Sequence, residues 1–142
     1  MNSKKFAKNL IDFIYNSPTA FHAVSTSKEL LDANGFIELD SCKMWDVKVG
    51  GKYYITKNSS AIVAFTVNSD NIEKEGFRII GSHSDSPSFR IKPNAEIESE
   101  KAYLKLNTEC YGGPILSTWL DRPLGIAGRV IIRTDNILKP KE

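Results

Sequence analysis

The sequence predicts an α/β fold that continues into a β-rich piece, and three patterns indicate this. Apolar residues recur at helical spacing through the first part of the chain. An apolar run, residues 77–81 (FRIIG), then leads into polar residues and stops at Pro87, as a buried strand does when it leaves a sheet. After Pro87 the pattern changes to short strands without a helical period. We therefore expect the N-terminal portion of an α/β domain over residues 1–87 and the beginning of a β-rich domain over residues 88–142.

Two amphipathic helices are expected at the start of the chain. The apolar face of the first is formed by Phe6, Leu10, Phe13 and Ile14. The second begins after residues 17–19 (SPT), which can supply a first-turn proline and a cap, and it ends at residues 34–35 (NG). His22 lies in this helix with no other chelating residue three or four positions away. We therefore interpret His22 as a packing or capping residue.

A β-hairpin is expected next. Residues 52–57 and 61–67 are rich in aromatic and β-branched residues, and a short polar turn separates them. Between the helices and this hairpin we expect a short strand and an irregular loop, in which Met44 and Trp45 serve as core anchors. After the hairpin we expect a polar loop. The strand candidates beyond Pro87 are residues 89–92, 95–97, 102–106 and 129–133.

Composition narrows the class of protein. The chain has 142 residues, of which 41% are hydrophobic and 25% charged, as in one ordinary soluble domain. The net charge of +2 is spread along the chain without a basic block, which gives no support to nucleic-acid binding. Neither a signal peptide nor a membrane-spanning run is evident, so we expect a cytoplasmic protein with reduced thiols at Cys42 and Cys110. A disulfide in a secreted protein is the alternative, and it would need an export signal.

His83 and Asp85 are the candidate site residues. Alternate residues of a strand point to the same face, so the imidazole and the carboxylate would emerge together at the carboxyl end of the strand. Ligands of open α/β sheets bind at that end. A neutral imidazole is a common metal ligand, and a nearby carboxylate can fix its tautomer. An isolated His-x-Asp pair is also found in turns and surface hydrogen bonds, so the spacing alone leaves both readings open.

Several ordered motifs together are more specific than this pair. They are residues 17–24 (SPTAFHAV), 50–56 (GGKYYIT), 81–87 (GSHSDSP) with 91–93 (IKP), and 111–122 (YGGPILSTWLDR) with 127–130 (AGRV). In this order they resemble the N-terminal part of the aspartyl aminopeptidase and vacuolar aminopeptidase I family of zinc aminopeptidases, family eighteen of the metallopeptidases. The resemblance covers nearly the whole chain.

The resemblance implies a zinc-peptidase catalytic domain into which a β-rich dimerisation domain is inserted directly after the His-x-Asp strand. It further implies that His83 is the first ligand of a two-zinc site and that Asp85 is the catalytic carboxylate that clamps this imidazole. The remaining ligands and the general base would lie beyond residue 142. Asp121 resembles a bridging ligand of related enzymes, but the resemblance places it in the inserted domain, so we interpret it as structural.

The function implied by the resemblance is a metallo-aminopeptidase that releases N-terminal amino acids from peptides by two-zinc-assisted hydrolysis. Such an enzyme acts on peptides with a free N-terminus, forms homo-oligomers in its full-length form, and needs neither nucleic acid nor a membrane. We expect this chain to be an N-terminal fragment that is inactive alone. The alternative is a non-catalytic truncated chain, or a binding subunit that pairs through the β insertion. Substrate preference, acidic or apolar, is not encoded in these residues.

Overall fold

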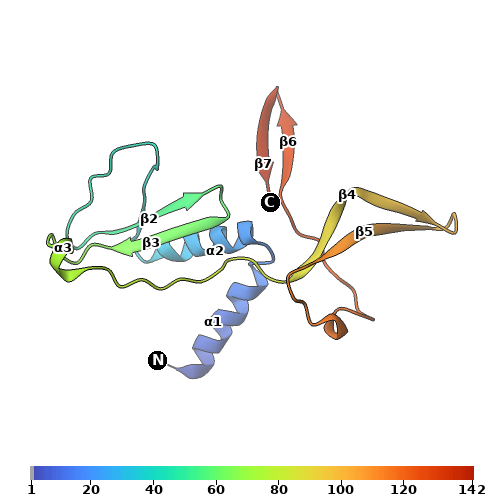
Figure 1. Cartoon of the computed structure of the whole chain (residues 1–142), viewed down its shortest axis with the longest axis horizontal. Coiled ribbons are helices and arrows are strands. Elements are labelled where there is room, and N and C mark those ends of the chain that lie inside the picture. Colours follow the sequence, from blue (N-terminus) through green and yellow to red (C-terminus); the bar gives the residue numbers. More distant parts are fainter. Residues whose placement is uncertain (1) are drawn as a thin grey trace. The chain divides into compact units, whose positions relative to one another are not determined.

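The computed structural model describes residues 2–142, and the chain divides into two compact units. The first unit contains the chain up to Asp85 together with Ala127–Glu142, and the second contains Ser86–Ile126. Helices and a small sheet make up the first unit, whereas a long β-hairpin dominates the second (Figure 1). The predicted α/β fold class is thereby confirmed.

The two N-terminal helices form where the sequence predicts them. Helix α1 spans Ser3–Tyr15 and helix α2 spans Ala20–Ala33. Thr19 is the N-cap of α2: its Oγ1 accepts a hydrogen bond from the backbone N–H of His22 and lies 2.7 Å from His22 Nδ1. The interpretation of His22 as a capping residue is therefore confirmed.

A three-stranded sheet follows the helices. Its order is β1 (Ile37–Glu38), β2 (Lys52–Lys57) and β3 (Ala61–Thr66), with β1 parallel to β2 and β2 antiparallel to β3. The predicted hairpin is confirmed. Its turn contains Asn58 and Ser59, which both adopt left-handed backbone conformations at φ angles of 51° and 54°.

Two adjacent tyrosines of β2 build the core of the first unit. Neighbouring strand residues point to opposite faces. The hydroxyl of Tyr54, whose exposed fraction is 1%, donates to Asp32 Oδ1 of α2 at 2.8 Å. On the other face, the Tyr53 ring packs 5.7 Å from that of Phe65, and the Tyr53 hydroxyl accepts from the N–H of Lys48. Burial, followed by the bond to Asp32, raises the pKa of Tyr54 to about 12.

The loop before β2 covers one face of the sheet only in part. Trp45 reaches the sheet, with its ring centroid 6.3 Å from that of Phe65, and it donates from Nε1 to the carbonyl of Asp40. Met44 is 99% exposed, so its prediction as a core anchor is wrong. In this loop it is the Trp45 ring that contacts the sheet, through Phe65, whereas the Met44 side chain faces solvent. A Cβ at Gly51 would overlap the Tyr53 ring, which explains the glycine at the start of β2.

The predicted buried strand, which would begin with residues 77–81 and carry His83 and Asp85 at its carboxyl end, is not formed. A short helix, α3 (Ile72–Glu75), replaces part of the expected polar loop, and residues 77–87 then run without strand pairing (Figure 1). The apolar side chains of this stretch are exposed, and Ile80 is 99% exposed. A strand needs neighbours for its backbone N–H and C=O groups. No strand of the described chain, residues 2–142, pairs with this run, so its apolar side chains stay uncovered.

The second unit is built on one long hairpin. Strand β4 (Ser88–Ser99) pairs with β5 (Tyr103–Tyr111), and a bulge lies between Ile91 and Glu96. The two strands predicted over residues 89–92 and 95–97 are thus one bulged strand, and Pro93 sits where the ladder is interrupted. Beyond β5, a 3-10 turn at Leu116–Thr118 leads to Trp119, whose ring meets that of Phe89 edge-on at 5.1 Å.

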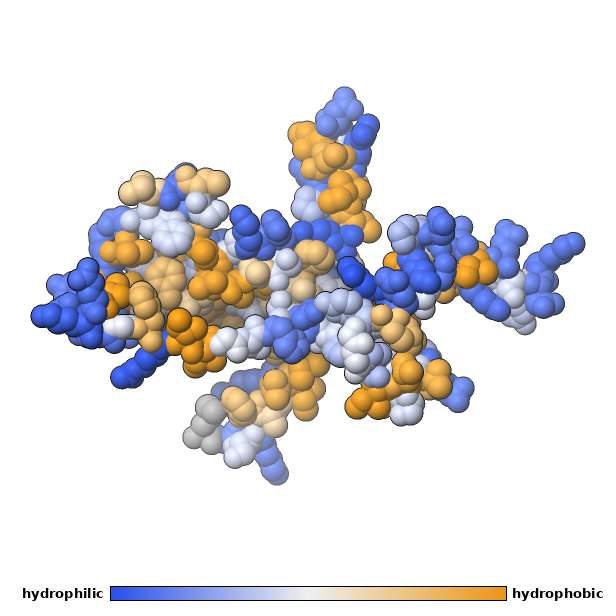
Figure 2. Space-filling view, in the orientation of Figure 1, coloured by the Kyte–Doolittle hydropathy of each residue, from blue (hydrophilic) through white to orange (hydrophobic). Residues whose placement is uncertain are grey.

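The last hairpin belongs to the first unit. Strands β6 (Val130–Thr134) and β7 (Ile137–Lys141) are antiparallel, and Asp135 and Asn136 form a two-residue turn with positive φ angles. The apolar residues along both strands are exposed (Figure 2). The assignment of all residues 88–142 to one inserted domain stays a prediction, while the compact units place residues 127–142 with the N-terminal body.

Candidate metal site

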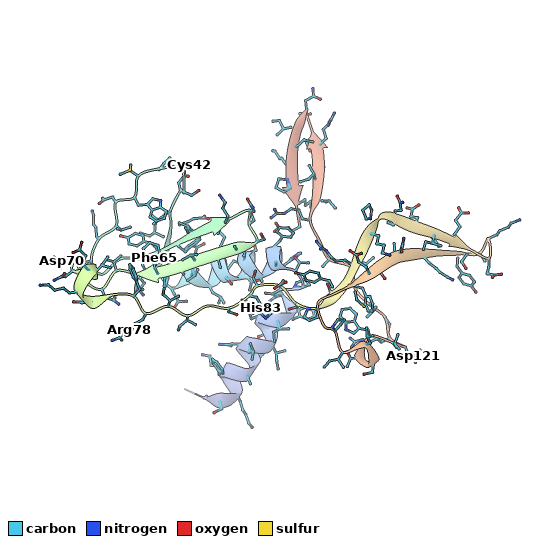
Figure 3. The ribbon with its side chains drawn as sticks, viewed as in Figure 1. Cys42, Phe65, Asp70, Arg78, His83 and Asp121 are labelled. Atoms are coloured by element: carbon cyan, nitrogen blue, oxygen red, sulfur yellow. The ribbon has the colours of Figure 1, made fainter. Side chains whose placement is uncertain are left out.

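The candidate site lies on the extended stretch that follows residue 80. Figure 3 shows His83 on a ribbon segment with neither helix nor arrow. One side-chain hydrogen bond ties this segment to the sheet: Ser84 Oγ donates to the carbonyl oxygen of Ser60, in the β2–β3 turn, at 2.9 Å. The site segment is therefore anchored to the packed part of the first unit without strand pairing.

His83 and Asp85 contact each other directly. The Nδ1 atom of His83 lies 2.8 Å from the carbonyl oxygen of Asp85 and 3.1 Å from its Oδ1. Both oxygens are acceptors, so Nδ1 must carry a hydrogen. In the neutral ring, Nε2 then holds the lone pair, because only one nitrogen of neutral imidazole is protonated. The structure thus fixes the tautomer of His83 that presents Nε2 as a ligand atom.

This arrangement fits one corner of a zinc site. Metal-binding histidines commonly donate the N–H of their second nitrogen to a carboxylate or a carbonyl, which orients the ring and increases ligand basicity. His83 has both kinds of acceptor on the same nitrogen. A stable zinc site also requires three or four ligands. Within residues 2–142, no group of three or more His, Cys, Asp or Glu side chains could hold a metal ion. The described residues therefore offer one candidate ligand, His83, and a candidate orienting partner, Asp85.

The site is open to solvent. The side chain of His83 is 80% exposed and that of Asp85 is 45% exposed. Two hollows of the first unit, with volumes of about 400 and 150 Å³, are lined by other residues. Because no strand is formed here, His83 and Asp85 do not lie at the carboxyl edge of a sheet. Both side chains face solvent instead.

The remaining candidates do not join the site. Asp121 is an exposed turn residue of the second unit with a φ of 55°. Cys42 and Cys110 are both reduced and exposed. Asp40 has a lowered pKa because its carboxylate accepts the N–H of Cys42 and contacts Lys43, which is a local turn contact. No helix in residues 2–142 is both long and apolar enough to cross a membrane.

Sequence reasoning missed Ser84 as a site residue. The pairing of His83 with Asp85 was expected from strand alternation, but it forms in a segment without strand structure, and the hydroxyl of the serine between them binds the carbonyl of Ser60. The signal was present in the sequence as alternation within residues 82–86 (SHSDS), which places a small hydroxyl on the side opposite to the site pair. Ser60 could not be predicted as a contact of the site, because it accepts the hydrogen bond through its backbone carbonyl, which every residue type has.

Comparisons with known proteins place this architecture in a family. Residues 13–141 match the family model described as aminopeptidase I zinc metalloprotease (M18). A Clostridium novyi protein named "Probable M18 family aminopeptidase 2" is 60% identical over 140 residues, which is 99% of this chain and 32% of that protein. The chain thus spans about a third of the length of the curated relatives it matches.

Solved structures agree with the family model. Yeast aminopeptidase 1 is similar with a TM-score of 0.86 at 35% identity, over 99% of this chain and 33% of that one. The dodecamer of S. cerevisiae mApe1 gives a TM-score of 0.86 at 34% identity, with the same coverage of 99% and 33%. The chain belongs to the M18 family of aminopeptidase I zinc metalloproteases.

Proposed function

We propose that this chain is the N-terminal portion of a metallo-aminopeptidase, in which His83 is a zinc ligand and Asp85 is the carboxylate that holds its ring. The complete site would contain two zinc ions, with the other ligands and the general base in a region that corresponds to the uncovered two thirds of the relatives. Its substrates would be peptides with a free N-terminus. Membership of a zinc metalloprotease family supports the chemistry.

One observation carries the assignment to His83. Its Nδ1 hydrogen is directed to two oxygens of Asp85, at 2.8 and 3.1 Å, so the lone pair of Nε2 is left for a metal ion. The other histidine of the chain is His22, whose Nδ1 contacts Oγ1 of Thr19, the N-cap residue of α2. Among residues 2–142, no carboxylate is a hydrogen-bond partner of this ring. When bound, zinc would supply a low-pKa water and polarise the scissile carbonyl. His83 would hold the ion through Nε2, and Asp85 would accept the hydrogen of Nδ1 and orient the ring.

Assembly and location complete the proposal. The mApe1 relative is a dodecamer by its description, which supports a homo-oligomer for the complete protein. Exposed apolar side chains on the β4–β5 and β6–β7 hairpins offer surface for such contacts. We further propose a cytoplasmic protein, on the basis of two free, exposed cysteines.

The test joins this chain to the part of the Clostridium novyi relative that it does not cover. The joined protein should release N-terminal residues from peptides, and a chelator should abolish this. His83→Ala should remove activity to background by removing a ligand. Asp85→Asn should retain metal but lose about 10- to 100-fold in rate, because orienting partners of metal ligands typically contribute that much.

His22→Ala is the matched control, since it removes the other imidazole of the chain and should leave activity within about twofold. Equal activity of the His83→Ala and His22→Ala proteins would contradict the role of His83. A folded, zinc-loaded joined protein without turnover on any peptide would favour the alternative of a non-catalytic binding chain. The 142-residue chain alone should show no chelator-sensitive turnover.

A further inference from the structure

Arg129, which precedes β6, contacts three distant parts of the sequence. Its Nε and Nη2 atoms donate to Glu142 Oε1, its Nη1 donates to the carbonyl of Asn58 at 3.2 Å, and its Cζ lies 3.8 Å from the centroid of the Phe21 ring. One guanidinium thus contacts the end of the β6–β7 hairpin, the β2–β3 turn and the start of α2. Figure 1 shows these three elements meeting where the C-terminus is marked.

The contact with Glu142 closes the open end of the last hairpin. Val130 pairs with Lys141, so Arg129 and Glu142 stand on the next rung of the ladder. Their side chains are largely covered, at 19% and 26% exposure, which makes this ion pair less screened than a surface pair. Only a planar group with several N–H donors can bond Glu142 and Asn58 while it stacks on a ring. A lysine could not make all of these contacts.

The same turn that Arg129 contacts also holds the candidate metal site. Asn58 and Ser59 adopt left-handed conformations, which are strained for non-glycine residues and persist only where surrounding contacts fix them. Two such contacts are made to backbone carbonyls of this turn: Arg129 binds that of Asn58, and Ser84 binds that of Ser60. Ser84 lies between His83 and Asp85, so its backbone dihedrals set whether Nδ1 reaches the Asp85 oxygens.

We propose that Arg129 is a positioning residue for the candidate metal site: it fixes the β2–β3 turn, the turn anchors Ser84, and Ser84 holds His83 and Asp85 in contact. The inference rests on the proposed function of His83 for its significance, but the coupling itself can be measured without metal. The residues returning from the second unit thereby stabilise the imidazole that the chain presents before it enters that unit.

The experiment is nitrogen-15 NMR of the 142-residue chain at a pH where ordinary histidines are neutral. The chain has two histidines, so two imidazole spin systems are expected, and His22 serves as an internal reference. In the wild type, His83 should carry its hydrogen on Nδ1. In Arg129→Ala and in Ser84→Ala, the ratio of the Nδ1–H to the Nε2–H tautomer should fall about two- to fivefold, as expected for loss of one hydrogen-bond constraint.

Arg133→Ala is the matched control, because Arg133 is an exposed arginine of the same hairpin, and it should leave the ratio unchanged. The double variant Arg129→Ala with Ser84→Ala should change the ratio no more than Ser84→Ala alone, since both act through one connection. An unchanged His83 ratio in Arg129→Ala, with shifts confined to the β6–β7 hairpin, would overturn the proposal. So would equal responses of Arg129→Ala and Arg133→Ala.

Folding is monitored by the resonances of the buried Val24 and Tyr54. If Arg129→Ala loses them, Arg129→Lys is measured by the same criterion, because lysine keeps the cation near Phe21 but loses the bridging contacts. Zinc chloride is then titrated into the protein joined to the remainder of the Clostridium novyi relative, because residues 2–142 contain no group of three side chains that could hold a metal ion. A tautomer response without any zinc-induced shift at His83 Nε2 would leave the positioning role standing and refute the metal role. A zinc-induced shift at His83 Nε2, together with a tautomer ratio that is the same in the wild type and in Arg129→Ala, would support the metal role and refute the positioning role.

Discussion

The β2–β3 hairpin and the stretch of residues 77–80 have similar apolar sequences but different surroundings. In the hairpin, each strand finds its partner three residues away, α2 covers one face, and Phe65 with the preceding loop covers part of the other. Residues 77–80 have no strand partner among residues 2–142, and their apolar side chains face water. Pairing between neighbouring segments therefore suffices to fold the hairpin. Residues 77–80 depend on partners that are distant in sequence and stay unpaired, even though His83 and Asp85 just beyond them are in contact.

The largest expected effect is on the packed side of this comparison. Tyr54→Ala should lower the free energy of unfolding of the first unit by about 3–5 kcal/mol, because it leaves a large cavity between β2 and α2. Chemical denaturation followed by circular dichroism measures this loss. Tyr15→Ala is the control, since Tyr15 is exposed and should change stability by no more than about 0.5 kcal/mol. Equal losses in both variants would show that the tyrosine core does not hold the unit together.

The pKa of Tyr54 predicts a fall in stability at alkaline pH. Its pKa is raised from 10.0 to about 12 in the folded chain, so the unfolded chain loses the phenolic proton first as pH rises. The stabilisation is complete below pH 10 and is lost between about pH 10 and 12, by roughly 2 kcal/mol. Tyr54→Phe should lack this component of the pH dependence. A wild-type curve that is parallel to that of Tyr54→Phe from pH 9 to 12 would contradict the burial of this hydroxyl.

Gly51→Ala tests the close approach of the backbone to the Tyr53 ring. The added Cβ would overlap that ring, so the tyrosine must move, at a cost of about 1–3 kcal/mol in the free energy of unfolding. Gly128→Ala is the matched control, because nothing lies within 4 Å of a Cβ at that position. A thermal or urea denaturation series distinguishes the two. The account of the β2 start fails if Gly51→Ala is no less stable than Gly128→Ala.

The smallest expected effect is on the open side. Ile80→Thr should change the stability of this chain by no more than about 0.5 kcal/mol, because the side chain is uncovered. In the protein joined to the remainder of the Clostridium novyi relative, the same substitution should cost more than 1 kcal/mol, since new neighbours would cover the run. Ile55→Thr in β2 should be destabilising in both proteins. A large loss from Ile80→Thr in the short chain would show that the run is already packed.

Short-range patterns predicted the parts of the fold that depend on short-range interactions. Helix periodicity and caps located α1 and α2, and a polar turn between two β-rich runs located the hairpin. The run at residues 77–81 has the composition of a buried strand, but composition cannot supply the neighbours that such a strand needs. The bulge between Ile91 and Glu96 was likewise missed, because Pro93 suggests a break where the strand only bends.

The candidate site was predicted in its residues more than in its geometry. His83 and Asp85 lie in contact as their spacing suggests, although the segment that carries them is not a strand. The bond that anchors this segment joins the Ser84 hydroxyl to the Ser60 backbone carbonyl, and neither group belongs to a recognisable motif. Arg129 is separated from Asn58 by 71 positions in the sequence, and no periodic pattern reports such a contact.

The central claim is that His83, with its Nδ1 hydrogen held by Asp85, presents Nε2 to a zinc ion. The most direct measurement is the zinc content of the protein joined to the remainder of the Clostridium novyi relative, determined by mass spectrometry after dialysis against metal-free buffer. The wild type and His22→Ala should retain equal zinc, whereas His83→Ala should bind zinc at least about tenfold more weakly and lose most of one ion per chain. If His83→Ala retains as much zinc as His22→Ala while folded, His83 is not a zinc ligand.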